Sequence, residues 1–134
     1  MNIRNKELDF EKLEGISALF VHVAKIDNNY TDKEKNIILG FLRSFSNNEK
    51  DIKRILKKAE NLENNSNQLL NFTNIIKQNS MDIKKNIIEH LWKVIISDGT
   101  VDQYESNLMR RICGLIYFPD KECAEIKLKL INSK

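Results

Sequence analysis

The chain has 134 residues, of which 41% are hydrophobic and 31% are charged, and its formal charge is +3. This length fits one domain, 1–134, that can bury a core without disulfides. The charge is too balanced to predict nucleic-acid or membrane binding by itself. No stretch approaches the roughly 18 consecutive apolar residues that a membrane span needs, and the N-terminal residues do not resemble a signal peptide. We therefore expect a cytoplasmic protein with no membrane partner.

Apolar residues recur at helical spacing along most of the chain, and one proline and four glycines leave few breaks for a sheet. In chain order, the stripes predict helices over about 10–26, 37–45, 52–62, 69–76, 83–96, 108–116 and 119–131. The fifth stripe is apolar around most of its circumference near its end, which is typical of a central, buried helix. The fold class predicted is an all-α bundle of about seven helices, with Trp92 in the core.

Helix starts are marked by three capping boxes, in which a Ser, Thr or Asp precedes a Glu by three residues. The boxes are Thr31 with Glu34, Ser46 with Glu49, and Asp102 with Glu105. Each box stands directly before an apolar stripe, so each predicts the first turn of a helix.

The chain resembles itself when it is shifted by 71 residues. Under this shift Asp27 aligns with Asp98, and the flanking apolar stripes align as well. The two capping boxes at 31–34 and 102–105 also coincide. We interpret this as an internal duplication of one helix–loop–helix unit, with repeat units at about 8–45 and 81–117 related by a pseudo-two-fold.

Two of the repeated acids have no capping role. Asp27 and Asp98 each end an apolar helix, where the helix dipole disfavours a carboxylate. Three explanations stay open: a local Asx-turn, a bound cation, or a contact with a Lys or Arg of the other unit. The remaining repeated polar residues are sufficiently explained by capping.

A cation at these turns would have oxygen ligands only, which suits Ca²⁺ or Mg²⁺. The Asp–Glu spacing of seven residues differs from that of an EF-hand loop. The candidate metal ligands are Asp27, Glu34, Asp98, Asp102 and Glu105. We predict no other cofactor.

Two segments carry a family resemblance. Val94-Ile-Ile-Ser-Asp98-Gly99, followed by Asp102 and Glu105, resembles the signature of the TerB-like family, named for tellurite resistance proteins. The segment from Val23 to Glu34 looks like the family's other half-motif, with Asn28 where the family favours glycine. The resemblance covers roughly residues 13–131. It implies an all-α bundle with an internal duplication, acidic residues on one surface that are suspected of metal binding, and bacterial occurrence either alone or joined to other modules.

Catalytic constellations are not recognisable in the sequence. His22 and His90 have no ligand at suitable spacing and are expected to be partly exposed helix residues. Cys113 and Cys123 lie ten residues apart without a CxxC motif, so we expect reduced, partly buried thiols.

The leading hypothesis is a non-catalytic module that binds another protein in stress or tellurite-related physiology, with a divalent cation at the acidic loops. The alternative is a metal-dependent enzyme that uses the same carboxylates. A third hypothesis is a weak nucleic-acid binder acting through the basic face of the third helix, although the absence of interleaved aromatic residues argues against nucleic acid. That face carries Lys50, Lys53, Arg54, Lys57 and Lys58.

Overall fold

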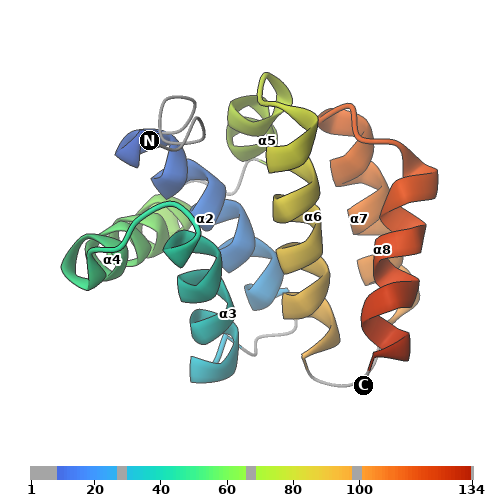
Figure 1. Ribbon diagram of the computed structural model, residues 1–134, viewed down its shortest axis with the longest axis horizontal. Coiled ribbons are helices and arrows are strands. Elements are labelled where there is room, and N and C mark those ends of the chain that lie inside the picture. Colours follow the sequence, from blue (N-terminus) through green and yellow to red (C-terminus); the bar gives the residue numbers. More distant parts are fainter. Residues whose placement is uncertain (1–8, 27–29, 66–68, 98–100, 134) are drawn as a thin grey trace.

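The computed structural model describes residues 9–26, 30–65, 69–97 and 101–133. Over these residues the protein is built from helices, without a strand (Figure 1). The helices are α2 (Phe10–Lys25), α3 (Asp32–Arg43), α4 (Glu49–Asn65), α5 (Leu69–Lys77), α6 (Met81–Ile96), α7 (Gln103–Leu115) and α8 (Asp120–Asn132). The predicted all-α fold is confirmed.

Helices α2 and α6 form the centre of the bundle. Helix α2 packs on α4 and α5, whereas α6 lies between α3 and α8 (Figure 1). Ten residues of α2 and nine residues of α6 are buried. The expected central position of the fifth helix is confirmed, and α2 shares it. Phe20 of α2 meets Phe41 of α3 with ring centroids 4.9 Å apart, and Trp92 is buried as expected.

The helix boundaries follow the shift of 71 residues closely. Helix α6 begins and ends 71 residues after α2, and α7 and α8 begin 71 residues after α3 and α4. Helix α5 has no counterpart at this shift among the described helices. The internal duplication itself stays a prediction, but the same shift that aligns the acidic motifs also aligns the helix starts.

One of the three expected capping boxes is wrong. Helix α4 begins at Glu49, and Asn48 caps it by accepting a hydrogen bond from the Asp51 N–H at 3.2 Å. Ser46 instead accepts from the Asn48 N–H at 3.2 Å. Asparagine is among the strongest N-cap residues, so Asn48 takes the position that the spacing from Ser46 to Glu49 suggested for serine.

Helix α7 ends in a Schellman turn. The Phe118 N–H donates to the Cys113 carbonyl at 2.8 Å, and the Tyr117 N–H donates to the Gly114 carbonyl at 3.4 Å. This pattern places Tyr117 at the left-handed position that glycine usually occupies, and its φ is 61°. The turn reverses the chain directly into α8.

Candidate functional site

The predicted acidic motifs border one end of the molecule. The last turns of α2 and α6 and the first turns of α3 and α7 lie at the lower end of Figure 1. Glu34, Asp102 and Glu105 belong to the described residues, whereas Asp27 and Asp98 lie outside them. The described part of the site therefore consists of two helix starts and the residues that contact them.

Glu34 is held in the first of these helix starts. One carboxylate oxygen, Oε1, accepts hydrogen bonds from the Thr31 N–H and from the Thr31 hydroxyl, both at 2.7 Å. The other oxygen, Oε2, lies 3.0 Å from the Ser97 hydroxyl. Glu34 is only 5% exposed, so these donors replace the water that the carboxylate loses on folding.

The same donors set the charge state of Glu34. Burial by itself raises the pKa of this carboxyl, but the hydrogen bonds from Thr31 and Ser97, together with the charge of Lys33, outweigh it and hold the pKa below its usual value. Glu34 is therefore a structural carboxylate that stays ionised at neutral pH.

Ser97 links the two acidic motifs. Besides facing Glu34, its hydroxyl lies 2.6 Å from the Val94 carbonyl, so the single proton is shared between two acceptors. The Lys33 ammonium donates to the Ser97 backbone carbonyl. Lys33 thus contacts the residue that precedes Asp98. A contact with a Lys or Arg of the other proposed unit was one of three explanations left open for the aspartates, and this lysine contact lies at the neighbour of one of them.

The second helix start contains the predicted capping box. The Glu105 N–H donates to Asp102 Oδ1 at 2.7 Å, and Glu105 Oε1 accepts from the Asp102 N–H at 3.2 Å. Glu105 is 4% exposed, whereas Asp102 is exposed. The capping explanation of these two acids is confirmed.

These caps limit what the described acids can bind. Within the described ranges, no group of three His, Cys, Asp or Glu side chains could hold a metal ion. Two cavities open elsewhere, one between α6 and α8 and one beside α7 and α8, and neither is lined by Glu34, Asp102 or Glu105. The metal-site prediction thus depends on Asp27 and Asp98.

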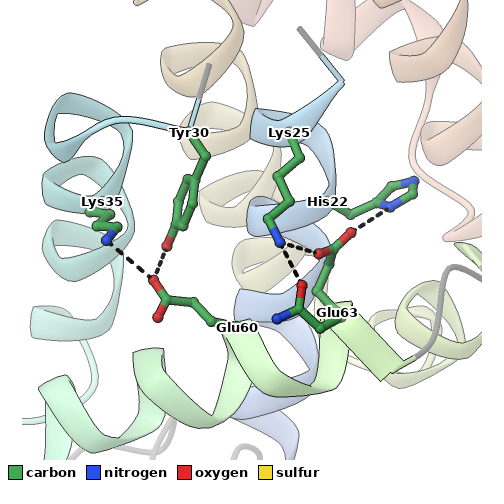
Figure 2. Close-up of polar contacts among 7 residues, drawn as sticks. His22, Lys25, Tyr30, Lys35, Glu60 and Glu63 are labelled. Carbon is green, nitrogen blue, oxygen red and sulfur yellow. Dashed lines mark hydrogen bonds and ion pairs between the residues drawn. The ribbon is translucent and has the colours of Figure 1, made fainter. Parts of the chain in front are cut away.

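A polar cluster centred on α4 adjoins the first motif and was not predicted from the sequence (Figure 2). Glu63, 7% exposed, lies 2.9 Å from the Lys25 ammonium and 3.4 Å from His22 Nδ1. Lys25 also donates to the Asn64 side chain at 2.8 Å. These contacts fasten the end of α2 to the end of α4.

One turn earlier on α4, Glu60 binds the other side of the same motif. Its Oε2 accepts a hydrogen bond from the Tyr30 hydroxyl at 2.5 Å and lies 3.8 Å from the Lys35 ammonium (Figure 2). Burial, followed by the hydrogen bond to Glu60, raises the pKa of the Tyr30 hydroxyl. Helix α4 therefore contacts residues on both sides of the 27–29 segment. The sequence feature that could have indicated these contacts is the spacing of Glu60 and Glu63, which lie three residues apart and so on one face of the helix.

The remaining candidate residues lie on the surface. All five cations of the α4 face are exposed, and two of them form ion pairs, Arg54 with Asp51 at 2.8 Å and Lys58 with Glu14 at 3.8 Å. His22 and His90 are partly exposed, as expected. None of the described helices is long and apolar enough to cross a membrane.

Comparison with known proteins gives one match. A family model described as tellurite resistance protein TerB matches residues 14–128. The chain belongs to the TerB family. No curated protein and no solved structure matches the chain.

Proposed function

We propose that the chain is a non-catalytic binding module of the TerB family, whose acidic end binds a partner protein with the help of Ca²⁺ or Mg²⁺. The observation that supports this is the contact between Ser97 and Glu34 at 3.0 Å. It joins a residue that borders the 98–100 segment to a residue that follows the 27–29 segment, and this supports a proposal in which both segments take part in binding. The suggested setting, tellurite or stress physiology, follows from the family alone.

The chemistry of the described acids favours binding over catalysis. A general acid needs a raised pKa and access to a substrate. Glu34 has a lowered pKa, and both Glu34 and Glu105 are buried in helix caps. Glu34 and Glu105 stabilise the helix starts beside the acidic segments. Asp27 and Asp98 are the residues that we propose as cation ligands. Carboxylates on a fixed frame are pre-organised for a hard cation.

Calorimetric titration of the full chain with CaCl₂ and with MgCl₂ tests the cation. We expect a heat of binding that falls to the level of dilution in an Asp27→Asn, Asp98→Asn double variant. The matched control is Asp82→Asn, an exposed acid in the first turn of α6 at the other end of that helix. An absence of binding heat in the parent protein, or an equal loss in the control, contradicts the cation proposal.

Hydrogen exchange of the same samples tests where the surface lies. We expect the divalent cation to slow amide exchange in segments 26–36 and 97–107 together, because one contact joins their borders. Slower exchange in only one segment would contradict a shared surface. Protection along α4 alone would instead favour a contact at the basic face.

The basic face of α4 carries the second candidate function, binding of an acidic polymer such as nucleic acid. Five exposed cations support it, but Arg54 and Lys58 already have acidic partners within the protein. Fluorescence anisotropy with a labelled single-stranded oligonucleotide between 50 and 200 mM salt, a range of about fourfold, tests this function. Affinity that falls steeply with salt and is weakened by Lys53→Gln supports it, and no binding at the lowest salt excludes it.

A further inference from the structure

Two cysteines that look unrelated in the sequence meet in the fold. Cys113 lies in the last turns of α7, and Cys123 lies in the first turn of α8. Both are buried and free of disulfides, at 0% and 5% exposure. The two side chains lie close enough to interact, since each shifts the pKa of the other. The chain therefore holds two neighbouring buried thiols.

The connection between α7 and α8 produces this contact. The Schellman turn folds Phe118 back onto the Cys113 carbonyl at 2.8 Å, and the Cys123 N–H donates to the Pro119 carbonyl at 3.1 Å. The Trp92 indole N–H, from α6, donates to the Cys123 carbonyl at 3.2 Å. Three separate bonds thus hold the backbone on both sides of the pair.

The two thiols are chemically unequal. Cys123 lines the cavity beside α7 and α8, together with the cations Arg110, Lys121 and Lys127 and the acid Asp120. The hydrogen bond from Cys113 lowers the pKa of Cys123 despite its burial, and the same bond, followed by burial, raises the pKa of Cys113. Cys123 is therefore the more acidic of the two thiols, and it is the one that lines a cavity open to solvent.

We propose that Cys113 and Cys123 form an oxidation site, in which a small hydroperoxide that enters the cationic cavity is reduced and an intramolecular disulfide is formed. Cys123 is the attacking sulfur because it lines the cavity, and Cys113 is the resolving sulfur because it is the fully buried neighbour. This site is separate from the acidic turns and does not depend on the function proposed for them.

The chemistry balances in two steps. The Cys123 thiolate attacks one peroxide oxygen, the O–O bond breaks, and the alkoxide or hydroxide leaves with the proton that Cys123 gave up. Cys123 is then a sulfenic acid. The Cys113 sulfur attacks the Cys123 sulfur, the S–O bond breaks, and the departing hydroxide takes the Cys113 proton as water. Two thiols lose two electrons, and one hydroperoxide becomes an alcohol and water.

Treatment of the reduced full-length chain with hydrogen peroxide tests the proposal. We expect both thiols to disappear together under denaturing thiol titration, with an intact mass that has lost two hydrogen atoms. Peptide mapping should find Cys113 linked to Cys123 within one chain, and dithiothreitol should restore both thiols. A gain of oxygen atoms without this link, or a link only between chains, overturns the proposal.

Single variants test the assigned roles. In the Cys113→Ser variant we expect hydrogen peroxide to form a sulfenic acid on Cys123 that dimedone traps. In the Cys123→Ser variant, the remaining Cys113 should react with peroxide roughly tenfold more slowly than Cys123 does in the first variant. Equal reactivity of the two single variants contradicts the roles. The Lys127→Gln variant should slow the oxidation, and Lys57→Gln, on the distant exposed face of α4, is its matched control. Because the parent protein alone can show or fail to show the link, the proposal is tested even if a variant does not fold.

Discussion

The Ser97 hydroxyl lies 3.0 Å from Glu34 Oε2, although the two residues are 63 positions apart in the chain. One carboxylate therefore serves two purposes: it caps α3 through Thr31 and it holds the end of α6 through Ser97. A cap is ordinarily a local device. Here the same group also joins the two acidic motifs, so changes at Glu34 act on both.

This shared role predicts an energetic coupling. We expect Glu34→Gln to lower the free energy of unfolding by about 1–3 kcal/mol and Ser97→Ala to lower it by about 1 kcal/mol. The double variant should lose less free energy of unfolding than the sum of the two single losses. The difference, which is the coupling energy, should be at least about 0.5 kcal/mol. Urea unfolding measures all three. The combination of Ser97→Ala with Glu105→Gln, which lies in the other cap, is the control and should be additive.

Acid should weaken the protein through Glu34. Because its folded pKa is held below the usual value of 4.5, this carboxylate contributes stability above that value, and the contribution is lost as the pH falls through the folded pKa. Glu34→Gln should therefore show a smaller decrease in the free energy of unfolding between neutral and acid pH than the parent protein. Urea midpoints across this range measure it. Parallel curves for the two proteins would show that Glu34 is not responsible.

His90 should titrate below the usual value of 6.5. Burial lowers the pKa of its imidazole, which packs against the Phe41 ring at 5.4 Å and lies 2.8 Å from the Asn86 carbonyl through Nδ1. A lowered folded pKa means that the unfolded chain binds the proton more readily, so stability falls as the pH drops below 6.5. An NMR titration of the His90 ring protons measures the midpoint directly. A midpoint above 6.5 would contradict the packing described.

The close approach of α2 and α5 depends on Gly15. A Cβ at this position would lie 2.2 Å from Ile75 Cδ1, so Gly15→Ala forces the isoleucine to move. Ile75→Val should cost about 1 kcal/mol in the parent protein but be neutral or stabilising in the Gly15→Ala background, because it removes Cδ1. Thermal unfolding of the four proteins measures this reversal. Gly40→Ala is the matched control, since no atom lies within 4 Å of its added Cβ, and it should stabilise α3 by about 0.5–1 kcal/mol.

Tyr117 occupies a left-handed backbone position that favours glycine. Its ring also receives the Lys77 ammonium at 5.0 Å, so a direct comparison with the parent protein would mix two effects. Tyr117→Gly and Tyr117→Ala both remove the ring contact. We expect the glycine variant to be more stable by about 1 kcal/mol, the reverse of their order inside a helix. If alanine is the more stable, the turn differs from the one described.

The sequence predicted the features that depend on local spacing. The caps at Thr31 and Asp102 follow from a residue and its neighbour three positions on, and these were found along with the helical stripes. Even there the N-cap of α4 is Asn48 and not Ser46, because several residues near this helix start have side chains that can cap it. Such patterns are local because a helix repeats within a few residues.

Contacts between helices could not be predicted from spacing. The partners of Glu63 lie about forty residues away on α2, and the meeting of Cys113 and Cys123 depends on the turn around Tyr117. These contacts follow from the angles at which helices pack, which one sequence does not reveal. The residues that bear most directly on the metal prediction, Asp27 and Asp98, lie outside the described residues.

Trp92 is the only tryptophan in the chain, and its indole N–H is bonded to the first turn of α8 while the Lys127 ammonium lies 5.3 Å from its ring centre. The tryptophan fluorescence of the protein consequently originates at one contact between α6 and α8. If α8 detaches before the rest of the bundle unfolds, the emission should shift to the red while the far-ultraviolet circular dichroism is still mostly unchanged. The protein thus contains its own optical reporter for the order in which its helices come apart.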